Sequence, residues 1–315
     1  MGLLSFLVYL RLKFSATIIR FFAQRQMGKP CPKPTSVLRI PSRDKDCVIK
    51  VHVYQPSTPP SGPLPVLLNF HGSGFVIPLH GSDDRYCREV VSQTNSYTVL
   101  DVQYRLSPEH PYPAALHDAE DALTYVVAHP DLYSPTQICL SGFSAGANLA
   151  LALSSNPKNP NISSIAAVLA FYPPTNLSIQ PDQKQSPEPL IGKNPIPTFV
   201  ARVFNKSYIR DSTPTNPLIS PLFFPDATIW PKNVLVITAG QDTLCKEGEE
   251  LAERLQREGK KLGDMDRMVK WKRMTGVGHA WDKAVKKGST AEERRDEAYG
   301  MAVEILKAVL SSRKK

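Results

Sequence analysis

The sequence predicts an α/β fold in which one mostly parallel central sheet is flanked by helices. Short runs of β-branched and apolar residues alternate with segments of helical periodicity through the middle of the chain, and this alternation is typical of parallel strands joined by crossover helices. The length of 315 residues and the 42% hydrophobic and 21% charged fractions favour a single globular core that carries an insertion.

The expected elements follow from these runs. Strands are predicted where apolar and β-branched residues cluster, at 47–54, 64–70, 97–102, 137–141, 165–171, 233–239 and 268–274. Helices are predicted where apolar residues recur every three or four positions, at 84–92, 114–128, 145–154, 247–258 and 291–310. Strand and helix therefore alternate through the centre of the chain.

Two stretches do not fit this alternation. They are residues 1–43 and residues 173–221, and the second is rich in Pro, Asn, Gln and Ser with weak periodicity. An irregular insertion between core strands usually forms a lid or a binding loop. We therefore expect residues 44–172 and 222–315 to form the core and the two irregular stretches to form one cap.

The beginning of the chain is apolar and basic. The apolar run at 3–10 is followed by Arg11 and Lys13. This run is too short to span a bilayer, and it lacks the charge order and cleavage site of a signal peptide. We expect a helix that packs on the cap, with contact to a membrane surface as the alternative.

The net charge of +9 is unevenly distributed. Residues 1–43 contain eight Lys and Arg and no acid, and residues 256–315 carry a net charge of +7. Nucleic acid is excluded as a partner because no recognition motif accompanies these bases. A solvated basic surface is expected, and weak attraction to anionic lipid is the sharper alternative.

Cysteine usage bears on metal binding and on location. The five cysteines are an odd number, widely spaced and without a Cys-x-x-Cys pair: Cys31, Cys47, Cys87, Cys139 and Cys245. This pattern indicates a reducing compartment and predicts no zinc site. We expect a cytoplasmic protein, or one associated with a membrane surface, and the sequence leaves the oligomeric state open.

A candidate nucleophile stands between a predicted strand and a predicted helix. The pentapeptide G-F-S-A-G at residues 142–146 follows the strand at 137–141 and leads directly into a good helix, with Ser144 at its centre. A sharp strand-to-helix turn needs small residues on both sides of the serine so that the two elements can approach. The setting therefore predicts a nucleophile elbow.

Three more turns complete the constellation. The strand at 64–70 is followed by the Gly-rich turn H-G-S-G-F at residues 71–75, which can aim backbone N–H groups at a developing oxyanion. Asp242 and His279 each follow the end of a later strand. Because carboxyl ends of parallel strands share one edge of a sheet, Ser144, Asp242 and His279 are predicted to meet there as nucleophile, orienting acid and base.

Other titratable residues fit this pattern less well. Glu247, Glu249 and Glu250 are interpreted as the charged first turn of a helix. Five further histidines are weaker candidates for the base. His52 lies within a predicted strand, His117 on a predicted helix and His129 at the end of one, and all three are interpreted as structural or solvent-facing. His71 belongs to the Gly-rich turn and His110 to a Pro-flanked loop.

The motifs together resemble the hormone-sensitive-lipase-like branch of the α/β hydrolases, which includes bacterial and fungal carboxylesterases. The resemblance begins near residue 66 and runs to the end of the chain. It rests on HGSGF at 71–75, YRLSPEHPYPAAL at 104–116, GFSAGANLA at 142–150, SPL at 220–222, GQDTLCKEG at 240–248 and GHAW at 278–281.

This resemblance implies more than the residues alone indicate. It implies an α/β-hydrolase fold with a cap built from the N-terminal segment and from an insertion after the sixth strand. It also implies an oxyanion hole formed by the backbone N–H groups of Ser73, Gly74 and Ala145.

Three positions depart from the pattern of that branch. Ser73 replaces a glycine, which strains the turn if this position requires a positive φ. Phe143 stands where many members have Asp, and Ala147 where many have Gly. The loop that contains Arg105, Glu109 and His110 is interpreted as bracing near the site.

The predicted function is hydrolysis of a small-molecule carboxylic ester through an acyl-enzyme, without a metal or an organic cofactor. Three alternatives stay open at this stage. The first is a ligand receptor on the same scaffold. The second is a non-hydrolytic reaction at the same site, such as acyl transfer, elimination or cyclisation. The third is an interfacial lipase.

Overall fold

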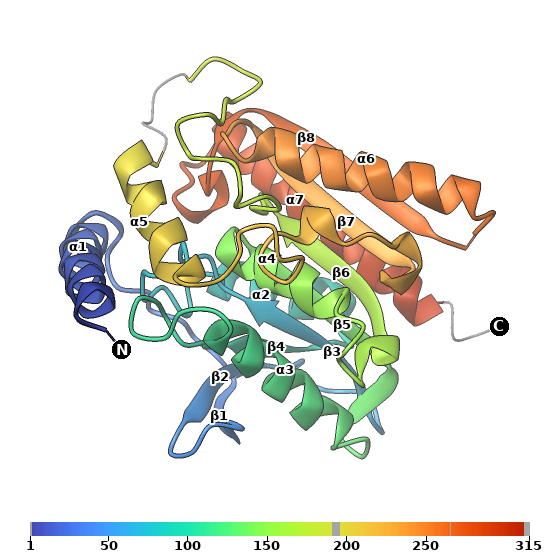
Figure 1. The fold of residues 1–315 in the computed structure, drawn as a ribbon. Helices are drawn as coiled ribbons and strands as arrows, with labels where there is room; N and C mark the ends of the chain where they lie inside the picture. Colours follow the sequence, from blue (N-terminus) through green and yellow to red (C-terminus); the bar gives the residue numbers. More distant parts are fainter. Residues whose placement is uncertain (1, 191–195, 265, 312–315) are drawn as a thin grey trace.

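The computed structural model describes residues 2–190, 196–264 and 266–311, so residues 191–195 of the expected cap insertion lie outside the described part. In that part, eight strands form one sheet in the order β1-β2-β4-β3-β5-β6-β7-β8 (Figure 1). Strands β1 and β2 pair antiparallel, as do β2 and β4, and the remaining neighbours are parallel. The strands are β1 (Ser36–Pro41), β2 (Val48–Tyr54), β3 (Leu64–Phe70), β4 (Thr98–Val102), β5 (Tyr133–Phe143), β6 (Ile165–Phe171), β7 (Asn233–Gln241) and β8 (Met268–Gly278).

Helices cover both faces of the sheet. Helices α3, α4 and α6 lie on one face, and α2 and α7 lie on the other (Figure 1). Alternating side chains of β3 show why, since Leu68 and Phe70 join the apolar core under α3 and α4 while Leu67 joins the core under α2 and α7. The helices are α1 (Leu3–Met27), α2 (Asp84–Thr94), α3 (Ala114–Val127), α4 (Ala145–Ser154), α5 (Thr198–Ile209), α6 (Cys245–Lys261) and α7 (Thr290–Ser311).

The sequence located the core elements well and two peripheral ones poorly. Strands β3 and β6 and helix α4 begin and end at the predicted residues. Residues 36–41, which the sequence placed in the cap segment 1–43, instead form the edge strand β1. Only Ile40 of this strand is buried, so the strand has no apolar run to announce it. Helix α5 lies in the 173–221 insertion, where periodicity predicted no helix.

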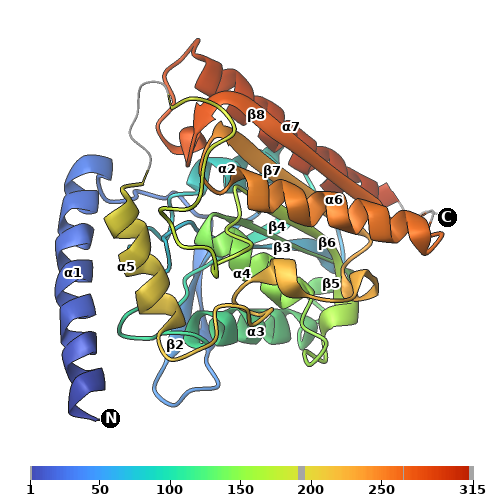
Figure 2. The same cartoon turned by 45° about the horizontal axis from the view of Figure 1, so that its top comes forward.

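Helices α1 and α5 lie side by side at one end of the molecule (Figures 1 and 2). Ala16 of α1 packs with Val76 and with Phe204 of α5 in a small apolar cluster separate from the two main cores. The insertion after β6 therefore packs against the N-terminal helix. Within the described ranges, no helix combines the length and apolar character needed to cross a bilayer.

Candidate active site

The turn at Ser144 is possible only because glycines stand two positions before and two positions after it. A Cβ atom on Gly142 would lie 2.3 Å from the Gly146 carbonyl oxygen, and one on Gly146 would lie 1.9 Å from the Phe70 carbonyl oxygen. Ser144 itself has a φ of 50°, which non-glycine residues rarely adopt. The close approach of β5, α4 and β3 therefore holds the serine backbone in a strained conformation at the end of the strand.

The structure brings Ser144, Asp242 and His279 together from three separate strand ends. The distance from His279 Nε2 to Ser144 Oγ is 3.0 Å, and the distance from His279 Nδ1 to Asp242 Oδ2 is 2.7 Å. A carboxylate only accepts hydrogen bonds, so Nδ1 carries the proton and Nε2 accepts from the Ser144 hydroxyl. The serine oxygen is thereby placed within reach of an unprotonated nitrogen.

Burial and charge act in opposite directions on His279. Burial disfavours the imidazolium, but the charge and hydrogen bond of Asp242 outweigh it, and the pKa of His279 is raised above its ordinary value. Asp242 is 4% exposed, and its other oxygen accepts a hydrogen bond from the Leu244 N–H at 3.0 Å. This second bond fixes the carboxylate that orients the imidazole ring.

The Gly-rich turn after β3 is held by a side-chain network. Tyr104 donates its hydroxyl to the His71 carbonyl at 2.6 Å and lies 2.7 Å from Ser73 Oγ, which in turn accepts the Phe75 N–H at 2.9 Å. Ser73 is not among the described residues with positive φ, whereas Gly74 has a φ of 55°. The serine that replaces glycine therefore causes no strain and ties the turn to the loop after β4.

The backbone N–H groups expected to face an oxyanion are not engaged elsewhere. Across the described residues, no hydrogen bond is found from the N–H of Ser73, Gly74 or Ala145. Ala145 is the first residue of α4, and the first N–H groups of a helix have no partner within it. The turn at Gly72 lies against Ser144, since a Cβ there would be 3.6 Å from the Ser144 Cβ.

Helix α5 covers this turn. A Cβ on Gly74 would lie 2.3 Å from the ring of Phe204, so the aromatic ring occupies the space that a side chain at 74 would need. Ser144 is 8% exposed and Phe204 is 7% exposed. An element of the insertion thus packs on the Gly-rich turn next to Ser144.

A buried cation lies against the end of β5. Lys283 Nζ is 2.7 Å from Asp83 Oδ1 and 2.8 Å from Asp282 Oδ2, and it lies 3.4 Å from the centroid of the Phe143 ring. Burial alone would lower the pKa of Lys283, but the two carboxylates outweigh it and raise this pKa. Phe143, where the resemblance led us to expect an acid, instead gives this lysine an aromatic face.

Tyr172 links this cluster to the imidazole. It follows β6, and its ring meets the His279 ring edge-on with centroids 4.9 Å apart. Its hydroxyl donates to Asp282 Oδ1 at 2.8 Å, and Tyr299 donates to the other oxygen of that carboxylate at 2.7 Å. The wall behind His279 is therefore fixed by hydrogen bonds from two elements.

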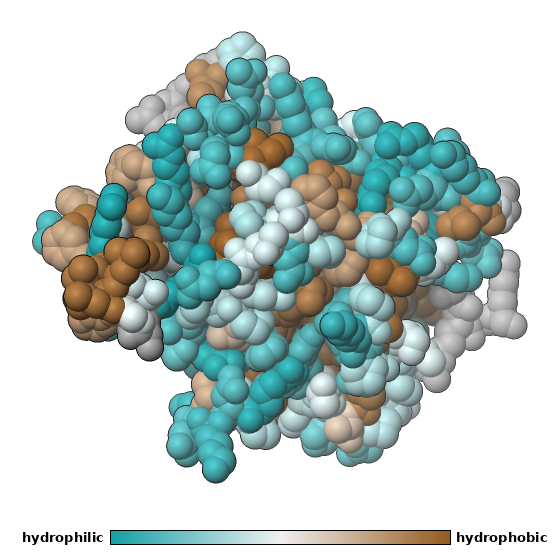
Figure 3. All heavy atoms as spheres, in the orientation of Figure 1, coloured by the Kyte–Doolittle hydropathy of each residue, from teal (hydrophilic) through white to brown (hydrophobic). Residues whose placement is uncertain are grey.

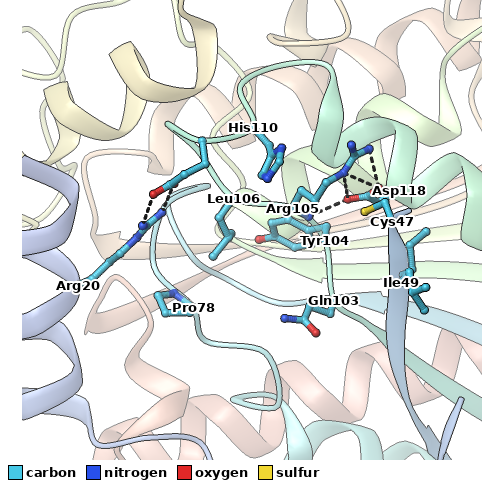
Figure 4. Close-up of a pocket in the computed structure, with 12 residues that line it drawn as sticks. Arg20, Cys47, Ile49, Pro78, Gln103, Tyr104, Arg105, Leu106, His110 and Asp118 are labelled. Carbon is cyan, nitrogen blue, oxygen red and sulfur yellow. Dashed lines mark hydrogen bonds and ion pairs between the residues drawn. The ribbon is translucent and has the colours of Figure 1, made fainter. Parts of the chain in front are cut away.

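A cavity of about 390 Å³ lies between α1, β2 and the loop after β4 (Figure 4). Ser144 is not among its lining residues. Its charged groups are paired with each other, Arg105 with Asp118 at 2.8 Å and Arg20 with Glu109 at 2.7 Å. These pairs connect α1 and α3 to the loop, which agrees with a bracing role for that loop.

His52, His80 and Asp101 form the group of described side chains whose ligand atoms come close enough for a metal ion, within 4.8 Å of one another. The two imidazole rings are stacked at 4.0 Å, so their lone pairs do not converge, and His80 Nε2 donates to the Asp101 carbonyl at 2.9 Å. Burial and the charge of Asp83 raise the pKa of Asp101, whereas a metal ligand must be deprotonated. The arrangement fits a metal poorly, and the expected lack of a metal stays a prediction.

Two of the other histidines make structural contacts within the fold. His71 is buried and stacks on Tyr104 with ring centroids 4.4 Å apart. Burial lowers the pKa of His71 to about 4, so it is neutral near pH 7. His129 bonds the Tyr125 carbonyl at the end of α3. The structural interpretation of His129 agrees with this contact.

The comparisons with known proteins fit this geometry. A family model described as the alpha/beta hydrolase fold matches residues 67–282. The chain belongs to the α/β-hydrolase fold family. The matched region begins in β3 and ends just beyond His279, so this hydrolase shares with its family the part of the chain that holds the site.

Several relatives of the hydrolase are esterases or hydrolases by name. An AB hydrolase superfamily protein of Schizosaccharomyces pombe is 28% identical over 254 residues, which are 75% of this chain and 74% of that protein. Carboxylic ester hydrolase LipN of Mycobacterium tuberculosis is 31% identical over 216 residues, which are 65% of this chain but only 55% of LipN. A hyperthermophilic esterase from the archaeon Pyrobaculum calidifontis superposes with a TM-score of 0.72 at 26% identity, covering 98% of this chain and 92% of that esterase.

These likenesses confirm the resemblance to the hormone-sensitive-lipase-like carboxylesterase branch. They support the prediction of a carboxylic ester hydrolase and do not favour the non-hydrolytic alternative. Sequence reasoning nevertheless missed several residues that shape the site of this hydrolase: Tyr104, Tyr172, Asp282 and Lys283. A signal existed for Tyr172 and Lys283, because each stands just past a strand or motif that carries the site.

Proposed function

We propose that this hydrolase is a serine carboxylesterase in which Ser144 attacks the ester, His279 transfers protons and Asp242 orients His279. The observation that carries the proposal is the bridging position of His279, 3.0 Å from Ser144 Oγ and 2.7 Å from Asp242 Oδ2. These distances lie in the range for a nucleophile, its base and the group that orients the base.

Acylation follows from this arrangement. His279 Nε2 takes the hydroxyl proton while Ser144 Oγ bonds to the acyl carbon, and the carbonyl electron pair moves onto oxygen. Asp242 stabilises the imidazolium that forms. When the tetrahedral intermediate collapses, His279 gives its proton to the departing alcohol oxygen, and the acyl group stays on Ser144.

Deacylation repeats the same steps with water. His279 removes a proton from water, the resulting oxygen attacks the acyl carbon, and the proton returns to Ser144 Oγ as the carboxylic acid leaves. We propose the N–H groups of Ser73, Gly74 and Ala145 as the oxyanion hole for both intermediates. One such donor typically contributes on the order of 3 kcal/mol to transition-state stabilisation.

We also propose that residues 1–43 and 173–221 supply the cap over the core at 44–172 and 222–315, with the strand at 36–41 as an edge of the core. Two contacts support this division. Phe204 of the insertion covers Gly74, and Ala16 of the N-terminal helix packs with Phe204. Cap residues then border the space that an acyl chain or alcohol group would enter.

The proposal is tested by Ser144→Ala, with hydrolysis of a p-nitrophenyl ester of a short acid as the measurement. We expect loss of at least about 10⁴-fold in kcat, because no other side chain replaces the serine oxygen. Ser61→Ala, at an exposed serine before β3, is the matched control and should keep full activity. A fluorophosphonate probe should label the native protein and the control but not the variant. Substantial turnover by Ser144→Ala would overturn the proposal.

A further inference from the structure

Helix α1 has two faces with different surroundings. On one face, Leu12 and Ala16 are buried, and Ala16 packs with Val76 and Phe204, with Ile19 against the same cluster. Arg20 on this side reaches the Val76 carbonyl at 2.9 Å. This face fastens α1 to the rest of the molecule.

The opposite face is apolar and exposed. Six large apolar residues recur along it at spacings of four, three, four, four and three, and each is between 41% and 77% exposed: Leu3, Leu7, Leu10, Phe14, Ile18 and Phe21. At about 3.6 residues per turn, these positions share one side of the helix, roughly opposite Leu12 and Ala16. We call these six residues the outer face. Figure 3 shows hydrophobic surface gathered over α1 at the left edge of the molecule.

Basic residues accompany the outer face, and acids do not. Arg11, Lys13 and Arg25 are exposed on α1, and residues 1–43 contain eight Lys and Arg without a single Asp or Glu. The acids that partly offset these bases in the net charge lie after residue 43 in the sequence, outside α1. An exposed apolar stripe on a helix whose charged residues are all cations is complementary to a surface that offers hydrocarbon and negative charge together.

This charge pattern distinguishes the two obvious occupants. A second copy of the chain, packed through the same face, would bring the Arg and Lys of one helix against those of the other with no acid on either helix. A bilayer with anionic lipid supplies the missing negative charge. The helix is 25 residues long, about 37 Å at 1.5 Å per residue, and it is not apolar enough to cross a bilayer.

We propose that the outer face of α1 binds the surface of a bilayer containing anionic lipid, with the helix lying in the plane of the membrane. The apolar side chains enter the boundary between headgroups and acyl chains, and Arg11 and Lys13 remain at the level of the phosphates. The buried face of α1 then attaches the rest of the protein to the membrane surface. This inference concerns binding and is independent of the proposed chemistry.

The test is co-sedimentation of the full chain with vesicles. One preparation is phosphatidylcholine with roughly one third phosphatidylserine, and the other is phosphatidylcholine alone. We expect binding to the anionic vesicles, weaker binding to the neutral ones, and release at high salt. Arg11→Gln with Lys13→Gln should weaken the anionic binding roughly 30-fold, because each basic residue contributes about 1 kcal/mol at such a surface.

The apolar contribution has its own pair of variants. Leu7→Gln with Phe14→Gln changes two residues of the outer face that are 53% and 70% exposed, and it should reduce vesicle binding at least roughly ten-fold. Leu132→Gln with Leu262→Gln changes two residues of 49% and 56% exposure that lie away from α1, and it should leave binding unchanged. All variants should keep the near-ultraviolet circular dichroism of the native protein.

Three outcomes would overturn the proposal. The first is no binding of the native chain to anionic vesicles. The second is equal loss of binding in the outer-face pair and in the control pair, which would show non-specific adsorption. The third is dimerisation, measured by sedimentation velocity, that the outer-face pair abolishes while vesicle binding is absent, which would make a second copy the occupant.

Discussion

The turn at Ser144 and helix α1 are held in place by different means. The turn is fixed by backbone contacts so close that Gly142 and Gly146 cannot carry a Cβ, and by a buried cluster around Lys283. Helix α1 is fixed by a few apolar contacts and by Arg20, and ten of its large apolar residues stay exposed, six of them on the outer face. The turn at Ser144 is closely packed on all sides, whereas α1 keeps a large exposed apolar surface.

The two regions need different positional precision. A nucleophile must stay within a few tenths of an ångström of its base, and close packing on all sides provides that. A helix that meets another surface needs only to present one face, and a small attachment is enough for that. Three substitutions sharpen the comparison, from the largest expected effect to the smallest.

Asp242→Asn should have the largest effect. The amide can present N–H to His279 Nδ1 and favour the wrong tautomer, so kcat should fall on the order of 10⁴-fold. The pKa of His279, which Asp242 raises, should fall when the negative charge is removed. Because His279 must be neutral to accept the serine proton, the acid limb of kcat/KM should move to lower pH, as measured in a pH–rate profile.

The control for this prediction is Asp266→Asn, at a carboxylate whose side chain is 82% exposed. Its rate and pH profile should equal those of the native protein. An Asp242→Asn profile with an unshifted acid limb would contradict the assignment of that limb to His279.

Lys283→Met should have the next largest effect, on stability. The change leaves Asp83 and Asp282 buried without their cation, which typically costs about 3–5 kcal/mol in the free energy of unfolding. Lys232→Met breaks a surface pair with Asp266, and that lysine is 61% exposed, so it should cost less than about 1 kcal/mol. Urea denaturation measures both values. If the two variants lose equal stability, the cluster beneath Ser144 does not anchor the site.

Arg20→Gln should have the smallest effect, and a local one. The guanidinium donates to Glu109 at 2.8 and 2.7 Å and to the Ser107 carbonyl at 2.9 Å, so its loss should lower the opening free energy of α1 by about 1–2 kcal/mol. Amide hydrogen exchange should become roughly ten-fold faster in α1 and stay unchanged in α4.

Arg25→Gln serves as the control, because its guanidinium lies over the Phe21 ring on the same helix, 4.7 Å from the centroid, and clamps nothing to the core. Its exchange pattern should match that of the native chain. Equal protection of α1 in Arg20→Gln and in the native chain would show that apolar contacts alone hold the helix.

Prediction from sequence succeeded where the signal is local. The core strands β3 and β6 have the predicted bounds because their apolar runs are buried on both faces. Helix α4 has the predicted bounds because it begins at a sharp turn. Strand β1 was not predicted because it is an edge strand with one buried side chain. Helix α5 was not predicted because its buried residues are confined to its second half, 204–209, and the chain around it is rich in Pro.

The sequence by itself determined the fold class, the nucleophile turn, and the order of Ser144, Asp242 and His279. These depend on periodicity and on small residues next to one another, and such short-range sterics can be read along the chain. Only the tertiary structure decided which side chain covers Gly74, which cation lies over the Phe143 ring, and which face of α1 stays exposed. Those contacts join residues as far apart as Asp83 and Lys283, and only packing of the whole chain brings such residues together.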